Sequence, residues 1–124
     1  EEVMSTNIMR QLYENIAEKY KVALWIFQGY QWYVTRIDSF AENEIRIIKH
    51  KPDVMSIDEL SVNWDKNGIC PNKLLIAAEE KKINEIQADM GMWENREFDI
   101  ARSSGNYLEI FPKCVDKGKA IISL

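Results

Sequence analysis

The chain has 124 residues, of which 46% are hydrophobic and 29% charged, with a net charge of −4 and an isoelectric point near 5.1. This length suits one domain with a single hydrophobic core, and the composition excludes a disordered, collagen-like or low-complexity chain. The net negative charge argues against a basic surface that binds nucleic acid. The sequence has no apolar run long enough for a membrane helix and no signal-peptide pattern. We therefore expect a soluble, cytoplasmic protein with neither nucleic acid nor membrane as its partner.

The first third of the chain predicts a helix followed by a β-hairpin. Apolar residues recur every four positions from Met4 to Tyr20, which is typical of one face of an amphipathic helix. Residues 22–27 and 30–35 are apolar, β-branched or aromatic and flank Gly29, a pattern that favours two strands joined by a tight turn.

The middle of the chain has a weaker pattern. Helical spacing returns over residues 37–48, and this helix must end before Pro52, because the residue ahead of a proline disfavours the helical region. Between residues 51 and 72, positions 57–60 favour the start of a short helix, and positions 65–68 have turn chemistry.

The last third predicts a strand, a helix and a second hairpin. Residues 73–78 indicate a buried strand and residues 79–90 a helix, and Gly91 suits the left-handed position just past the end of that helix. Residues 98–103 and 107–111 have the alternation of two strands around a turn.

This order of elements predicts the fold class. We expect a further helix from Lys117 onward, because Asp116 is a residue type that caps helix N-termini. Hairpins interleaved with helices predict an α+β fold, a two-layer α/β sandwich. We expect its mostly antiparallel sheet to be covered on one face by helices and free on the other.

Complete catalytic or metal-binding motifs are absent from the sequence. There is no nucleophile elbow, no glycine-rich phosphate loop and no Asp-x-Asp pair that would begin a magnesium site. Cys70 and Cys114 lack zinc-ligand spacing; a disulfide between them stays open, and we interpret them as free thiols, as is usual in the cytosol. The single histidine, His50, either ends a helix as a cation favourable to the dipole or contacts a substrate. We expect neither a metal nor a cofactor in this chain.

Three segments of the C-terminal half carry a resemblance to a known family. Residues 72–77 read Asn-Lys-Leu-Leu-Ile-Ala, residues 108–110 read Leu-Glu-Ile, and residues 115–120 read Val-Asp-Lys-Gly-Lys-Ala. This combination resembles the Cof-type phosphatases of the haloacid dehalogenase (HAD) superfamily, in which such a strand, a helix, a hairpin and a Lys-Gly turn follow one another. The first 70 residues agree with that family only in the order of their elements.

The resemblance implies a two-domain parent enzyme. Residues 1–112 would form the cap, or substrate-specificity, domain, and residues 113–124 would start the re-entry into a Rossmann-like core. The parent would be a magnesium-dependent phosphoric monoester hydrolase acting on small phosphorylated metabolites such as sugar phosphates. The family's nucleophile and metal motifs are absent here, so we expect an excised domain, inactive alone, whose partner is its own core and whose Mg²⁺ is bound only in the full-length parent.

The resemblance also implies site residues. Lys117 matches the family's catalytic lysine, which pairs with the nucleophile and the transferring phosphoryl group, and Gly118 lets the backbone turn closely there. Arginines suit a second phosphate or a carboxylate, and aromatic rings suit a sugar or pyridine ring. The candidates for substrate binding are Trp32, Arg36, His50 and Arg102.

Two alternatives stay open at this point. The chain could be a free-standing α/β module that binds a small ligand, or a protein-interaction domain whose sheet face, rich in Trp and Tyr, meets a partner. Neither alternative gives the Lys-Gly motif a purpose.

Overall fold

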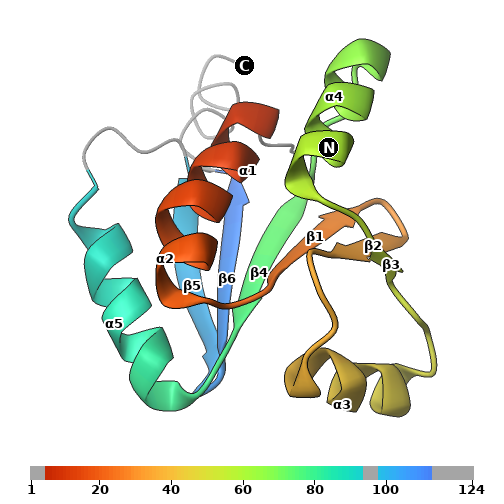
Figure 1. The fold of residues 1–124 in the computed structure, drawn as a ribbon. Coiled ribbons are helices and arrows are strands. Elements are labelled where there is room, and N and C mark those ends of the chain that lie inside the picture. The colour runs from red at the N-terminus through yellow and green to blue at the C-terminus, as the bar shows by residue number, and fades with distance from the viewer. Residues whose placement is uncertain (1–4, 94–97, 113–124) are drawn as a thin grey trace, which may run out of the picture.

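The computed structural model describes residues 5–93 and 98–112 (Figure 1). Its helical elements are α1 (Thr6–Leu12), the π-helical turn η1 (Tyr13–Ala17), α2 (Glu18–Tyr20), α3 (Ser39–Ile48), α4 (Ile57–Asn67) and α5 (Glu80–Gly91). Its strands are β1 (Leu24–Gln28), β2 (Gln31–Val34), β3 (Asp53–Val54), β4 (Lys73–Ala77), β5 (Phe98–Ser104) and β6 (Tyr107–Pro112).

Elements α1, η1 and α2 form one continuous helical segment, as the apolar stripe predicts. The Ser5 side chain caps its N-terminus by accepting a hydrogen bond from the Ile8 backbone N–H at 3.3 Å. Within η1 the helix widens, because the Glu18 N–H donates to the carbonyl of Tyr13, five residues earlier. The segment ends at Lys21, which adopts a left-handed conformation with φ 58°.

The six strands form one sheet in the order β3-β2-β1-β4-β6-β5. Both predicted hairpins are confirmed, with β1 pairing β2 and β5 pairing β6 in antiparallel register. Strand β3 pairs parallel to β2, with Tyr33 opposite Asp53 and Val34 opposite Val54, so the sheet is mixed. Strand β3 is not among the predicted elements, because a strand of two residues carries no alternation to detect.

Helices α1, α4 and α5 and the turn η1 cover one face of the sheet, and the main hydrophobic core lies between the two layers (Figure 1). Alternate strand residues point into this core, which confirms the predicted α+β sandwich. The helical side chains that are almost fully buried in it include Met9, Leu12, Ile16, Leu60, Trp64, Ile83, Ile86 and Met90.

The opposite face carries a second, smaller cluster, so the expectation that this face is free of helices is wrong. Trp25, Trp32, Val34, Leu75 and Ala77 from the strands are buried in this cluster. Helix α3 packs over it and contributes one fully buried residue, Ala41, with Phe40 and Ile45 half-buried. The helix covers the face because its own apolar stripe needs a partner and the main core is already occupied by the other helices.

Two element boundaries differ from the sequence-based expectation. Residues 65–67 continue α4, and Gly68 adopts the left-handed C-cap conformation with φ 69°. Gly91 is the last residue of α5 rather than a left-handed cap, and the cap is Met92 with φ −91°. The turn chemistry of residues 65–68 therefore marks where a helix ends.

Asp65 joins the first helix to α4 across the helical layer. Its carboxylate accepts hydrogen bonds from the Thr6 hydroxyl and from Arg10 Nη2, the latter at 2.8 Å. The bond from Thr6, with a further contribution from Arg10, lowers the pKa of Asp65 below its ordinary value.

The start of α1 and the end of β6 lie at the same end of the molecule (Figure 1). The hairpin turn between β5 and β6 and the start of α5 lie at the other end.

Candidate functional site

Aromatic rings form a row across the sheet face that carries the smaller cluster. The ring centroids of Trp25 and Trp32 lie 5.1 Å apart, and those of Trp25 and Tyr107 lie 5.8 Å apart. The rings of Phe27 and Trp32 are stacked, with centroids 6.2 Å apart and planes at 4°. Strands β1, β2 and β6 place these residues on one face, because alternate side chains of each strand point the same way. We call Trp25, Phe27, Trp32 and Tyr107 the aromatic row.

His50 extends the aromatic row beyond the sheet. Its ring lies 6.4 Å from that of Trp32, with the planes at 26°. The approach follows from Lys49, whose left-handed conformation with φ 56° ends α3 and turns the next residue back toward the sheet. The structure therefore brings together two of the four predicted substrate residues.

An ion pair lies beside the aromatic row. Lys73 Nζ lies 4.9 Å from the ring centroid of Phe27 and 3.8 Å from Glu109 Oε1. Sequence reasoning missed both Lys73 and Glu109. The alternation of β4 and β6 could have placed each on this face, but only the observed register, with Leu74 opposite Ile110, brings them together.

Tyr107 connects the aromatic row to α3. Its hydroxyl lies 3.4 Å from Glu44 Oε1 of that helix. Burial, with a smaller contribution from the Glu44 charge, raises the pKa of Tyr107 above its ordinary value. The phenol is therefore neutral at physiological pH and can donate a hydrogen bond.

Arg36 lies apart from the aromatic row. Its guanidinium donates a hydrogen bond to the backbone carbonyl of Lys21. Two hollows of about 280 and 250 Å³ share Lys21, Val22 and Arg36 in their walls. The second of these hollows also contains Asp38 and Lys82, so its charges are mixed.

Arg102 lies on the helix-covered side of the sheet. Its Nη1 donates to Gln87 Oε1 of α5 at 2.8 Å, its Nε to the Ser104 carbonyl at 3.1 Å, and its Nη2 to the Gly105 carbonyl at 3.2 Å. These bonds join the second hairpin to α5. The guanidinium is thus already satisfied by residues of the fold.

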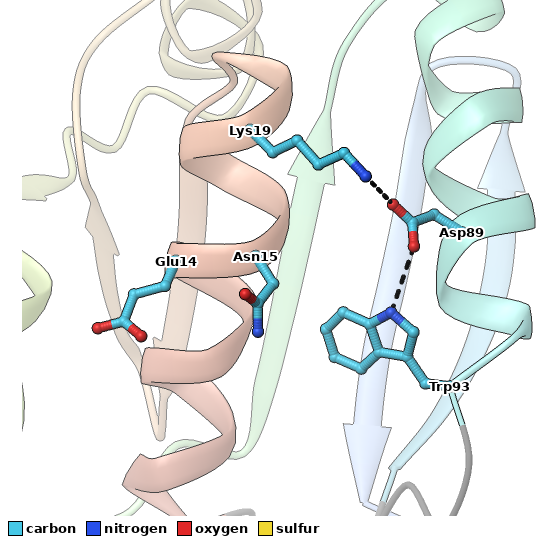
Figure 2. Close-up of a pocket in the computed structure, with 5 residues that line it drawn as sticks. All are labelled: Glu14, Asn15, Lys19, Asp89 and Trp93. Carbon is cyan, nitrogen blue, oxygen red and sulfur yellow. Dashed lines mark hydrogen bonds and ion pairs between the residues drawn. The ribbon is translucent and has the colours of Figure 1, made fainter.

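A polar pocket of about 280 Å³ lies between the N-terminal helical segment and α5 (Figure 2). Asp89 at its wall accepts hydrogen bonds from Lys19 Nζ at 3.0 Å, from the Tyr20 hydroxyl at 2.8 Å and from Trp93 Nε1 at 3.4 Å. The bond from Lys19 is the main reason that the pKa of Asp89 lies below its ordinary value, and burial acts in the opposite direction. Glu14 and Asn15 of η1 complete the lining. The close-up shows the Glu14 side chain directed away from Asp89.

The predicted catalytic residue Lys117 and the turn residue Gly118 lie outside the described residues, as does the segment 113–124. Within residues 5–93 and 98–112, no three His, Cys, Asp or Glu side chains come close enough to hold a metal ion. In the same part of the chain, every helix is too short or too polar to span a membrane.

A family model described as haloacid dehalogenase-like hydrolase matches residues 1–124. Solved structures share the fold. A protein from Thermotoga maritima is 21% identical with a TM-score of 0.73, and the alignment covers 96% of this chain and 43% of that one. A haloacid dehalogenase-like hydrolase from Bacteroides thetaiotaomicron is 18% identical with a TM-score of 0.71, covering 99% of this chain and 44% of that one. A HAD subclass IIB sugar phosphatase is 11% identical with a TM-score of 0.63, covering 100% of this chain and 46% of that one.

The chain thus spans less than half the length of these solved proteins. A comparison with curated proteins found no match.

Proposed function

The chain belongs to the haloacid dehalogenase-like hydrolases, and from this membership we propose that it is the cap domain of a magnesium-dependent, Cof-type phosphatase. One observation carries the proposal: the chain shares its fold over nearly its whole length with a solved haloacid dehalogenase-like hydrolase and a solved HAD sugar phosphatase while spanning less than half of either protein. In this proposal residues 1–112 form the cap, and residues 113–124 begin the re-entry into a Rossmann-like core.

The cap closes over the active site of the core and selects the substrate. Closure excludes water from the phosphoryl transfer and completes the set of residues around the leaving group. The substrate class would be small phosphorylated metabolites such as sugar phosphates, and the similarity to a sugar phosphatase supports this choice. We place the enzyme in the cytoplasm, where it would meet such metabolites.

The sheet face with the aromatic row is the best candidate for the specificity surface. Trp32 and His50 contribute adjacent ring faces there, and aromatic faces suit the C–H face of a sugar ring. Arg36 and Arg102 remain candidates, but each would have to give up hydrogen bonds that it already makes within the fold.

The chemical step would belong to the core. The described residues offer Mg²⁺ no cluster of ligands, so they do not fit the ion, and its site would lie in the rest of the parent. From the family resemblance, Lys117 would place its ammonium beside the transferring phosphoryl group, and Gly118 would allow the close turn. Charge neutralisation and positioning are what phosphoryl transfer needs most from a protein.

The test compares the full-length gene product with the 124-residue chain on a panel of sugar phosphates with Mg²⁺. We expect hydrolysis by the full-length protein and none by the shorter chain. Activity of the short chain alone would mean that it contains its own nucleophile, and it would overturn the assignment as a cap. If neither protein hydrolyses any phosphate ester, the phosphatase proposal is wrong, and a free-standing binding or interaction module becomes the better interpretation.

A further inference from the structure

Two indole N–H groups in the aromatic row are buried without a partner. Trp25 is 2% exposed and Trp32 is 4% exposed, and residues 5–93 and 98–112 offer no hydrogen-bond acceptor to either Nε1. A buried donor without an acceptor keeps its full desolvation penalty, so such groups are rare in native proteins. Two of them in neighbouring rings on one sheet face therefore need an explanation.

Helix α3 packs over the cluster that contains these two donors. It covers the cluster with one fully buried residue, Ala41, and the half-buried Phe40 and Ile45. Its last turn leaves two apolar side chains exposed, Ile47 at 65% and Ile48 at 46%, so part of its apolar surface is not buried on the sheet. By contrast α5, a helix of similar length, buries Ile83, Ile86 and Met90 completely.

The connections of α3 also suit a displaceable element. Residues 35–38 before it and 49–52 after it have no helix or strand structure. One side-chain hydrogen bond joins α3 to the sheet within the described residues, from the Tyr107 hydroxyl to Glu44 at 3.4 Å, near the upper limit for such a bond. The helix is thus held by little apolar burial and one long hydrogen bond.

We propose that Trp25 and Trp32 form a covered hydrogen-bond donor site for the oxygen atoms of a sugar-like ring, and that α3 is the cover that moves aside to open it. This inference rests on the proposed function and names the part of the surface that binds the leaving group of the substrate. The two N–H groups would bind the hydroxyl or ring oxygens of the leaving group while the phosphate stays with the core.

The chemistry of the site selects this ligand class. An indole N–H can only donate, so the ligand must present acceptor atoms such as hydroxyl or ring oxygens, and not ammonium groups, at this position. The aromatic row supplies flat apolar faces around the donors, which suit the C–H face of a sugar ring. Because both donors are neutral, the site needs no charge on the ligand, and a phosphate is not required for binding here.

Variants of the full-length protein test the donor role. Trp25→Phe and Trp32→Phe keep an aromatic ring and remove the N–H group, and Trp64→Phe is the matched control in the main core, where Trp64 is 2% exposed. For the best hexose phosphate of the panel, kcat/KM should fall about tenfold with each of the first two variants, as expected for a lost hydrogen bond. With acetyl phosphate, which has no ring, the fall in kcat/KM should be much smaller. A loss of equal size on both substrates, or no loss on either, would overturn the donor role.

A second experiment uses the unmodified protein, so it tests the proposal even if one of the variants does not fold. Addition of the hexose phosphate, and separately of the free hexose, to ¹⁵N-tryptophan-labelled full-length protein should shift the indole N–H signals of Trp25 and Trp32. Faster hydrogen exchange of α3 amides, with α5 unchanged, should accompany the shift. Unmoved indole signals would overturn the site, and shifted signals with unchanged α3 exchange would overturn the cover. The free hexose binds without turnover. Absence of phosphatase activity would therefore contradict the proposed function alone, and the titration with the free hexose would still decide the inference.

Discussion

The imidazole ring of His50 lies over the indole of Trp32, with centroids 6.4 Å apart and planes at 26°. The two residues reach each other from the end of α3 and from β2. The contact therefore depends on how α3 packs on the sheet. It places the exposed His50 ring at the border of the aromatic row, beside the buried Trp32. A ligand that enters from this side would meet His50 first.

We predict that His50→Ala changes substrate binding more than the chemical step. Loss of the ring removes one wall of the proposed surface, so KM for the preferred sugar phosphate should rise about two- to tenfold in the full-length protein while kcat stays the same. His50→Phe should restore most of the affinity, because it keeps a ring in place. Lys51→Ala, one residue further along, is the control, and an equal effect of that change would contradict a specific role for His50.

The domain should lose stability in acid partly through Asp65 and Asp89. Both carboxyl groups have a pKa below the ordinary value, Asp65 mainly through the hydrogen bond from Thr6 and Asp89 mainly through that from Lys19. The unfolded chain therefore binds protons more readily, so this stabilisation is complete above about pH 4 and is lost as the pH falls through the lower, folded-state pKa values.

The variant Asp65→Asn with Asp89→Asn tests this pH dependence. It should be less stable at neutral pH but should show a shallower fall in the urea midpoint between about pH 4 and pH 2. Glu18→Gln, at an exposed carboxylate with no ion pair among the described residues, serves as the control. If the double variant and the unmodified domain lose stability in parallel as the pH falls, the assignment to these two groups is wrong.

Two glycines at helix ends should respond in opposite ways to alanine. Gly68 has φ 69°, and a Cβ there meets no atom within 4 Å, so Gly68→Ala isolates backbone strain and should lower the free energy of unfolding by about 1 kcal/mol. Gly91 lies in the last turn of α5 with equal space, so Gly91→Ala should be neutral or stabilising by up to about 1 kcal/mol. Urea denaturation measures both changes, and an equal loss of stability would contradict this interpretation.

Lys117→Ala in the full-length protein should abolish most of the activity without destabilising the cap. From the family resemblance, its ammonium neutralises charge on the transferring phosphoryl group, and removal of one such group lowers kcat by about 100- to 1000-fold. Thermal unfolding should be unchanged, and Lys113→Ala should leave kcat near normal. A kcat for Lys117→Ala close to that of the unmodified enzyme would show that the family role does not apply to this residue.

The order of helices and hairpins could be predicted from the sequence because each has a distinct apolar period. The apolar spacing of Ile57, Leu60 and Trp64 also contained the signal for the full length of α4, but the turn residues near Gly68 obscured it. Strand β3 could not be predicted, because its two residues pair with β2 only after α3 has turned the chain back.

The candidate site was harder to predict, because its contacts depend on how elements pack. The sequence named Trp32 and His50 but not their proximity, which follows from the left-handed Lys49 and the position of α3. For Arg102 a signal was present, since strand alternation places it with Phe98 and Ile100 on the core-facing side.

The placement of the two ends of the described fold constrains how such a domain can move. Since α1 begins and β6 ends at the same end of the molecule, polypeptide connections to another domain would both leave from that end (Figure 1). A body attached through two neighbouring chains swings about the line that joins them far more easily than it turns about its own long axis. The sheet face would therefore approach a neighbouring domain along one arc, presenting the same side chains at every closure.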